Sequence, residues 1–173
     1  PVEKMFWGRL SLESATAQYY FTKESLMQRL MHRFKYRNNK ELGWQLGQLM
    51  GIALKNSNRF EKLDALVPLP LFPKKEKKRG YNQAFILCEG IAEILALPVL
   101  KNVVIRPQHT ETQTQKGRIE RWKNMEGKFV LAAPQKINNK HLLVVDDVDT
   151  TGANLEACGA GDVEAEHPVV GMA

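Results

Sequence analysis

Apolar residues recur at helical spacing in three stretches of the chain. The first covers residues 25–36, where Ser25 and Gln28 are placed as a capping box. A second apolar stripe runs from Leu42 to Leu54, and a third helical pattern runs from Asn82 to about Leu97. The pattern therefore predicts three helices, of which the first two pair with each other.

Shorter apolar runs of strand length alternate with these helical stretches. They span residues 63–69, 99–105, 127–132 and 141–145, with a further short candidate at 17–21. Near-continuous apolar strands are typical of a parallel sheet that is covered on both faces. The sequence therefore predicts an α/β fold with a mainly parallel central sheet and helices on both of its faces.

The chain length of 173 residues fits one integrated domain with a core of its own. Within it we expect residues 1–60 to form an N-terminal helical part that packs on a core spanning residues 61–173. Two connections between predicted elements are rich in Lys and Arg. One is the loop "FPKKEKKRGYNQ", and the other, residues 107–124, is long enough to be a lid or a binding loop.

The amino-acid composition limits the kinds of binding partner and the cellular compartment that we expect. The formal net charge of +6 favours an anionic partner such as nucleic acid, a phosphate ester or pyrophosphate. Cys88 and Cys158 form no C-x-x-C pair, so a disulfide scaffold and a zinc ribbon are unsupported. No apolar run has the length of a membrane span, and no signal-peptide pattern occurs. We therefore expect a cytoplasmic protein that has no membrane partner.

The last apolar run ends in two adjacent carboxylates, in the stretch "LLVVDDVDTTGANL". Asp146 and Asp147 follow the strand, and ligands of open parallel sheets bind beyond the carboxyl ends of the strands. The hydroxyls of Thr150 and Thr151 and the first free amides of a following helix make a nest for a phosphate. The pattern favours a ligand with a phosphate at one end and a diol or bound metal at the other, such as ribose 5-phosphate.

The same stretch is similar to the phosphoribosyl pyrophosphate binding signature of type I phosphoribosyltransferases. In that signature hydrophobic residues precede two acidic residues and a Thr-Thr-Gly loop. The stretches "VPLPLFPKKEKKRGYNQA", "HRFKYRNNKELG" and "ETQTQKGRIERWKN" also resemble one branch, the ComF/GntX family of competence-associated, phosphoribosyltransferase-like proteins. The resemblance covers residues 1–154 and implies a type I phosphoribosyltransferase-like fold with a flexible flap.

The resemblance also implies a set of site residues. Asp146 and Asp147 would be the catalytic pair, contacting the ribose hydroxyls directly or around Mg²⁺. Arg79 and Gly80 would lie near the pyrophosphate, and residues 108–123 would form the flap. The flap cations would be Lys116, Arg118 and Arg121, and the cradle of the 5-phosphate would be Asp149, Thr150, Thr151, Gly152, Ala153 and Asn154.

By the same resemblance, the protein would bind phosphoribosyl pyrophosphate or ribose 5-phosphate with Mg²⁺. If active, it would transfer the phosphoribosyl group to a nitrogen acceptor and release pyrophosphate. Positioning, the metal and the flap cations can supply most of the catalysis of such a reaction. His109 or Glu111 could serve as a general base, but their spacing selects neither.

Three other hypotheses stay open. The double aspartate could be a solvated strand end with a helix cap. Asp147 also begins a D-x-D-x-T pattern similar to the nucleophile motif of haloacid dehalogenase-like phosphatases, although little chain follows it.

The sequence also allows a homodimer under any of these hypotheses. In the third hypothesis the chain is a non-catalytic accessory protein of competence or DNA uptake. It would use the pocket for ligand sensing and its basic surface for single-stranded DNA or a DNA-processing partner. Cations in residues 74–79 and 116–123, interleaved with Tyr81 and Trp122, would form that surface.

Overall fold

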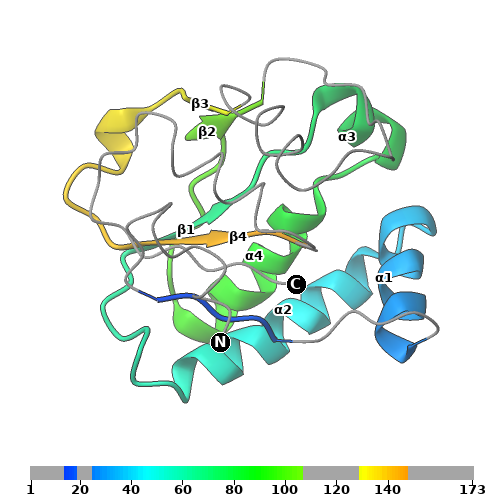
Figure 1. Ribbon diagram of the computed structural model, residues 1–173, viewed down its shortest axis with the longest axis horizontal. Helices are drawn as coiled ribbons and strands as arrows, with labels where there is room; N and C mark the ends of the chain where they lie inside the picture. Colours follow the sequence, from blue (N-terminus) through cyan, green and yellow to red (C-terminus); the bar gives the residue numbers. More distant parts are fainter. Residues whose placement is uncertain (1–13, 19–24, 107–128, 148–173) are drawn as a thin grey trace, which may run out of the picture.

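The computed structural model describes residues 14–18, 25–106 and 129–147 of the chain, and the structural statements below concern these residues. Helices and short strands alternate along them (Figure 1). In chain order the elements are α1 (Leu26–Tyr36), α2 (Lys40–Lys55), β1 (Ala65–Pro68), α3 (Pro73–Arg79), α4 (Gln83–Leu95), β2 (Val104–Ile105), β3 (Val130–Leu131), the 3-10 turn η2 (Pro134–Lys136) and β4 (Leu142–Val145).

Side-chain caps fix where three of the helices begin. Ser25 accepts a hydrogen bond from the Gln28 amide at 3.1 Å, as its place in the sequence predicts. Asn82 caps α4 in the same way, accepting from the Phe85 amide at 3.4 Å. Asn39, which the apolar pattern did not single out, caps α2 by accepting from the Leu42 amide at 3.0 Å. The predicted helices α1, α2 and α4 are thus confirmed.

The prediction of a loop at "FPKKEKKRG" is wrong, because residues 73–79 form the short helix α3. Pro73 stands in the first turn, where proline is well tolerated. Gly80 ends the helix with a left-handed φ of 84°, and its amide donates to the Glu76 carbonyl. An ideal Cβ at Gly80 would meet nothing within 4 Å, so its conformation, rather than crowding, favours glycine here.

A small parallel sheet forms the centre of the described part. β1 and β4 pair in parallel, from Ala65 opposite Leu142 to Pro68 opposite Val145. Val99 forms a single parallel bridge with Leu66, and β2 and β3 form a separate antiparallel pair. The runs predicted at residues 99–105 and 127–132 therefore contribute only two-residue strands in this part of the chain. The structure confirms mixed helix and strand with a parallel pair.

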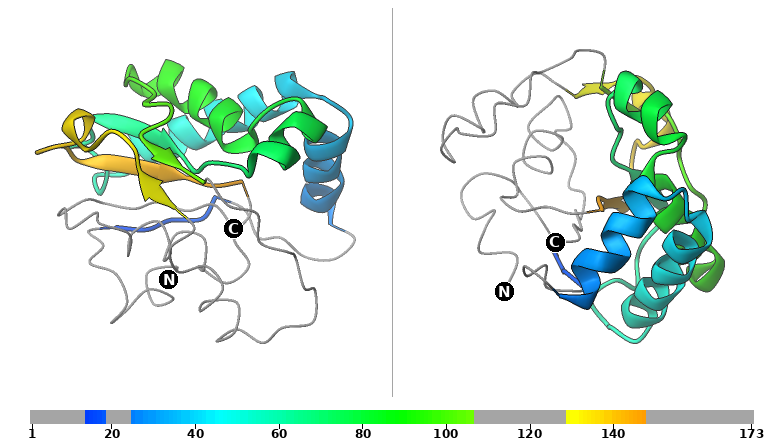
Figure 2. Two further views of the ribbon diagram at one scale, coloured as in Figure 1. Left: turned by 90° about the horizontal axis from the view of Figure 1, so that it is seen from above. Right: turned by 90° about the vertical axis from the view of Figure 1, so that its right-hand side faces the viewer.

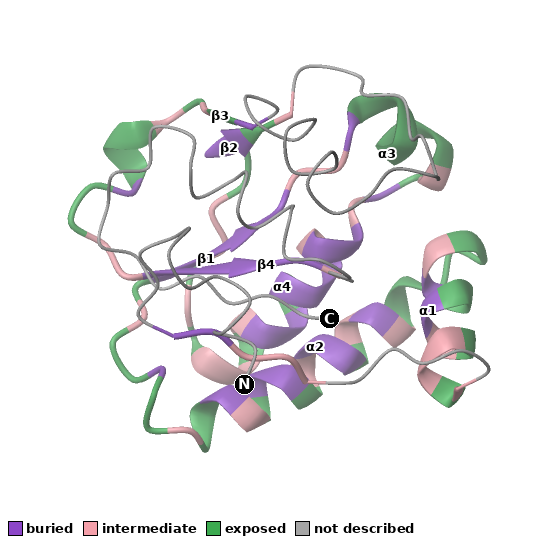
Figure 3. Ribbon diagram, in the orientation of Figure 1, coloured by how far each residue is buried: buried purple, intermediate pink, exposed green. Residues whose placement is uncertain are grey.

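Both faces of the β1–β4 pair are buried, but the described helices cover only one of them (Figures 2 and 3). On the helical face Leu66, Leu143 and Val145 belong to a core cluster with Leu87 and Ile91 of α4. The opposite face belongs to a second cluster, which contains Ala65, Val67, Leu142, Val144, Val103, Phe129 and Ile137. Helices were predicted on both faces; within the described ranges one face is covered by helices and the other by strands and connections.

Helices α2 and α4 approach each other through glycines. Gly43, Gly47 and Gly51 lie one turn apart along α2, and all three are buried. A Cβ on Gly47 would collide with the Leu87 carbonyl, and one on Gly90 with the Trp44 carbonyl. The two backbones are therefore in direct contact, which only glycine permits.

The described helices are also short. None of them is long and apolar enough to cross a membrane.

Candidate functional site

The carboxyl ends of β1 and β4 lie side by side and place two segments of the chain at one edge of the sheet. Pro68 is opposite Val145, and the Leu69 amide donates to the Val145 carbonyl at 2.9 Å. The Asn82 side chain donates to the Leu69 carbonyl at 3.0 Å, which ties the start of α4 to the same point. The segment after β1, the start of α4 and the double aspartate after β4 therefore meet here.

Asp146 and Asp147 differ in their surroundings. Asp146 is only 7% exposed, and its Oδ1 accepts a hydrogen bond from the Asp147 amide at 2.8 Å. This local bond turns the chain at the end of the strand. Asp147 forms an ion pair with Lys35 of α1, with 2.8 Å between Oδ2 and Nζ. The two carboxylates thus come from one strand end but face different neighbours.

Arg106 supplies positive charge on the Asp146 side. It directly follows β2, is partly buried and lies over the Phe129 ring at 5.0 Å. Burial lowers the pKa of the Arg106 guanidinium, and the negative charge of Asp146 opposes that change. Because a guanidinium stays protonated in proteins, Arg106 provides a permanent cation beside Asp146.

Two residues of α3 extend this positive region. Loss of hydration lowers the pKa of Lys75, and the charges of Arg106 and Arg79 lower it further. The charges of Arg79 and Arg106 therefore both act on the Lys75 ammonium group. Such repulsion favours an anion beside Lys75.

Contacts on both sides fix Arg79. Its Nη1 donates to the Gln83 side chain at 2.7 Å, and its guanidinium lies 5.6 Å from the centre of the Tyr36 ring. Gln83 is 1% exposed and donates in turn to the Tyr81 carbonyl at 3.4 Å. These contacts restrict the motion of the guanidinium and leave it further N–H donors.

The carboxylate pair fits Mg²⁺ only as a partial ligand set. Within the described ranges no three His, Cys, Asp or Glu side chains gather as a metal cage. Mg²⁺ is commonly held by one or two carboxylates together with waters and ligand phosphates. Asp146 and Asp147 supply such carboxylates, and the neighbouring cations Lys75, Arg79 and Arg106 suit the phosphates. The residues present are therefore compatible with a metal that arrives with a phosphorylated ligand.

Comparison with known proteins shows to which family the chain belongs. No family model matches the chain. The chain is 34% identical over 130 residues to "Competence protein F" of Haemophilus influenzae, and the match covers 73% of this chain and 57% of that protein. This chain belongs to the ComF family. "DNA utilization protein YhgH" of Escherichia coli is 29% identical over 129 residues, which cover 73% of the chain and 56% of that relative.

A more distant relative comes from Bacillus subtilis. "Competence protein ComFC" is 26% identical over 140 residues, which cover 78% of the chain and 52% of that protein. The ComF-family chain thus spans about half the length of the curated relatives that it matches. The names of these relatives connect the family with competence and DNA utilization.

The ComF-family structure brings together three of the side chains that the sequence proposed for the site. Asp146 and Asp147 lie at the carboxyl edge of the sheet, and Arg79 donates to Gln83 at the start of α4, which meets the same edge. Gly80 directly follows Arg79 and ends α3. Several other predictions fall outside the described residues. They are Asp149, Thr150, Thr151, Gly152, Ala153 and Asn154 of the phosphate cradle, the flap residues Lys116, Arg118 and Arg121, and His109, Glu111 and Trp122.

Sequence reasoning missed three cations of the edge. Arg106 follows an apolar run in the same way as Asp146 does, so the strand-end argument could have found it. Lys75 is four residues before Arg79, and the two would share a face once a helix is assumed there. No sequence signal connects Lys35 with Asp147.

Proposed function

We propose that this chain binds phosphoribosyl pyrophosphate together with Mg²⁺ at the carboxyl edge of the sheet. One observation carries the proposal: the two carboxylates at the end of β4 have cations from α1 and from the end of β2 as neighbours, and the charge of Arg106 also acts on Lys75 of α3. A simple anion site would not place carboxylates beside its cations. A sugar that bears hydroxyls at one side and a polyphosphate at the other satisfies both groups.

The division of charge suggests how such a ligand lies. Asp146 and Asp147 would accept hydrogen bonds from the ribose hydroxyls or hold Mg²⁺. Lys75, Arg79 and Arg106 would contact the pyrophosphate, for which arginine offers paired donors. The 5-phosphate would be held by residues 149–154, which directly follow the carboxylates in the sequence.

The proposed reaction is transfer of the phosphoribosyl group to a nitrogen acceptor. The bond between the anomeric carbon and the pyrophosphate oxygen breaks, and pyrophosphate leaves with the electron pair. The acceptor nitrogen bonds to the carbon and loses a proton to solvent or a base. Arg79 and Arg106 would stabilise the negative charge of the leaving group, and Mg²⁺, when bound, adds charge neutralisation there.

Calorimetry with phosphoribosyl pyrophosphate tests the binding step. We expect saturable heat in the presence of Mg²⁺ and at least about tenfold weaker binding without it, because the carboxylates then repel the anionic ligand. A titration with pyrophosphate alone measures the contribution of the cations. Equal affinity with and without Mg²⁺, or no binding at millimolar ligand, would remove the proposal. Release of pyrophosphate with a panel of nucleobases and amines separates turnover from binding.

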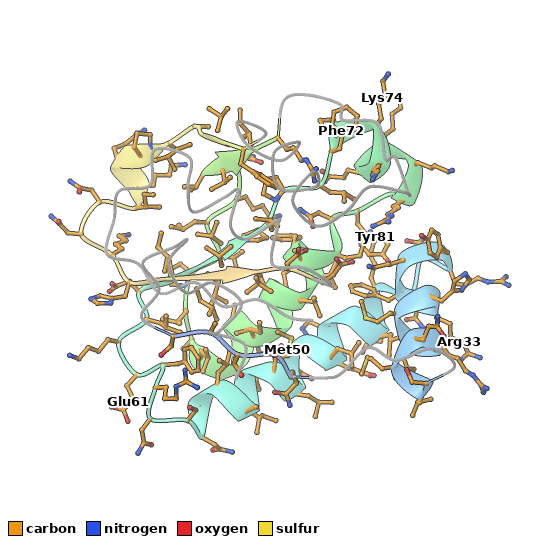
Figure 4. The ribbon with its side chains drawn as sticks, in the orientation of Figure 1. Arg33, Met50, Glu61, Phe72, Lys74 and Tyr81 are labelled. Carbon is orange, nitrogen blue, oxygen red and sulfur yellow. The ribbon has the colours of Figure 1, made fainter. Side chains whose placement is uncertain are left out.

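A second candidate function, binding of single-stranded DNA, is favoured by the surface of α1. This helix contains no acidic residue, and Arg29, Arg33 and Arg37 are exposed at four-residue spacing on it or directly after it. The rings of His32 and Tyr36, both exposed, lie 4.9 Å apart. Arg33 projects from the outer side of the helix (Figure 4). Cations beside exposed rings are the usual combination for single strands.

The residues that sequence reasoning gave to this surface need correction. Tyr81 is only 6% exposed, and its hydroxyl donates to the Phe34 carbonyl, so it cannot stack on a base. Tyr36, at 63% exposure, is the available ring. The names of the relatives, which mention competence and DNA utilization, support this candidate without deciding between an accessory protein and an enzyme.

Salt-dependent binding of labelled oligonucleotide tests the α1 surface. Changing Arg29, Arg33 and Arg37 together to Gln should reduce the slope of log affinity against log salt by about 2, at about 0.7 for each phosphate that is no longer neutralised. A control variant changes Lys55, Arg59 and Lys62, three exposed cations around the connection from α2 to β1, and removes the same charge. Equal slopes for both variants would mean that only net charge matters and that α1 is no specific surface.

A further inference from the structure

Lys35 lies outside the carboxyl edge and makes a direct ion pair with it. It lies in the last turn of α1 and reaches Asp147, far along the sequence, at 2.8 Å. The side chains of Lys35 and Asp147 are only 18% and 14% exposed. Solvent therefore screens the pair less than it screens a surface ion pair.

The backbone next to Lys35 is held firmly, so the pair does not depend on a frayed helix end. Phe34 is fully buried, and its ring occupies the space that a side chain at Gly43 would need. The Tyr81 hydroxyl donates to the Phe34 carbonyl, and the two rings lie 5.7 Å apart. Less freedom is lost when an already positioned lysine forms an ion pair.

The last turn of α1 also contacts the basic side of the edge, since the Arg79 guanidinium lies over the ring of Tyr36. The same turn therefore carries one contact to the carboxylates and one to the predicted pyrophosphate side. Asp147 is thus paired with Lys35, whereas the charge of Asp146 acts on Arg106.

We propose that Lys35 is a positioning residue that acts as a tethered counter-ion. It occupies Asp147 while the ligand is absent and competes there with Mg²⁺. Metal alone must displace the ammonium group and therefore binds weakly, whereas metal that arrives with phosphoribosyl pyrophosphate brings its own anionic ligands. Lys35 thereby makes metal binding depend on the ligand. The inference rests on the proposed function in one respect, the assignment of Mg²⁺ to this carboxylate pair.

The test measures the affinity for metal alone by electron paramagnetic resonance, with Mn²⁺ as the probe for Mg²⁺. Lys35→Met keeps most of the side-chain volume and removes the competing charge, so we expect Mn²⁺ to bind about fivefold more tightly. Lys55→Met, at an exposed position in the last turn of α2, removes one charge without contacting Asp147 and should leave the affinity within about twofold of the wild type. Lys35→Arg keeps the charge and should restore weak binding.

Equal affinities for wild type, Lys35→Met and Lys55→Met would overturn the inference, and so would a failure of wild type and Lys35→Met to bind Mn²⁺ at millimolar concentration. If Lys35→Met does not fold, acylation of lysines in the wild type, quantified by mass spectrometry, replaces the comparison. Saturating Mn²⁺ should then speed the labelling of Lys35 and not that of the exposed Lys40. Unchanged labelling of Lys35 would equally contradict the proposal.

Both measurements use metal alone, so their outcome is separate from that of the proposed function. Tighter Mn²⁺ binding by Lys35→Met, together with no binding of phosphoribosyl pyrophosphate by any variant, would refute the proposed ligand and keep the counter-ion. If phosphoribosyl pyrophosphate binds but Lys35→Met does not change the affinity for Mn²⁺, the proposed ligand is kept and the counter-ion role is refuted.

Discussion

Gly90→Ala is expected to lower the free energy of unfolding by about 3 kcal/mol or more, the upper part of the range for overpacked cores. A Cβ at Gly90 would collide with the carbonyl of Trp44 and would lie 2.8 Å from the Gln48 amide nitrogen. Both atoms belong to the backbone of α2, so relief requires the whole helix to move. That movement would separate α2 from α4, whose contact carries a large part of the helical core cluster.

The sign of this change is diagnostic. Replacing glycine by alanine inside a helix ordinarily stabilises the helix by about 1 kcal/mol, so a loss can come only from the helix contact. For a chain of this size the melting temperature should fall by about 6 to 12 °C. Glu93→Ala, at an exposed position of the same helix, is the control and should stay within about 0.5 kcal/mol of the wild type. Stabilisation by Gly90→Ala would mean that the two backbones do not touch as described.

The helices were largely predictable because their signals are local. The apolar stripe and the caps Ser25 and Asn82 lie within a few residues of the helix that they define. The glycines of α2 carry no such signal, because their role depends on α4. The short helix α3 was missed because its charged residues show no apolar period. Its only local signals are Pro73 in the first turn and Gly80 at the C-terminal cap.

The strands were less predictable because pairing involves distant parts of the chain. The apolar runs of β1 and β4 are strong enough to identify both, and their parallel pairing places Asp146 at the carboxyl edge as the sequence predicts. In the apolar run that begins at Val99, only Val99 itself pairs with β1, through a single parallel bridge to Leu66. Apolar composition alone does not tell how many residues of a run will find a partner.

For the candidate site, the sequence could identify the acidic half and only part of the basic half. Asp146 and Asp147 are adjacent, and a strand precedes them, so one short stretch suffices to predict them. Lys35 and Arg106 come from separate elements, and only the fold brings them to the two carboxylates. The cations around a site are therefore the part that a structure adds.

Arg106→Met is expected to weaken the binding of phosphoribosyl pyrophosphate with Mg²⁺ by about tenfold to 100-fold. The change removes charge-assisted hydrogen bonds worth about 1.5 to 3 kcal/mol. It also leaves Asp146, which is 7% exposed, without the arginine that opposes its charge. Calorimetry below the melting temperature of the variant measures the effect. Arg59→Met is the matched control, because Arg59 also lies over a phenylalanine ring, at 5.7 Å from that of Phe60, but precedes the opposite end of β1.

Ribose 5-phosphate separates the two ways in which Arg106 can act. If Arg106 contacts the pyrophosphate, Arg106→Met should weaken phosphoribosyl pyrophosphate strongly and ribose 5-phosphate by less than about twofold, because the smaller ligand lacks the leaving group. If Arg106 serves only to position Asp146, both ligands should weaken together, since both offer ribose hydroxyls to that carboxylate. We expect the first result. Lys75 and Arg79 of α3 share the positive region with Arg106, and a pyrophosphate is the part of the ligand that such a region would bind. Unchanged affinity for both ligands would show that Arg106 does not contact the pyrophosphate. The proposal that phosphoribosyl pyrophosphate binds here would then lack the cation that connects the positive region with Asp146.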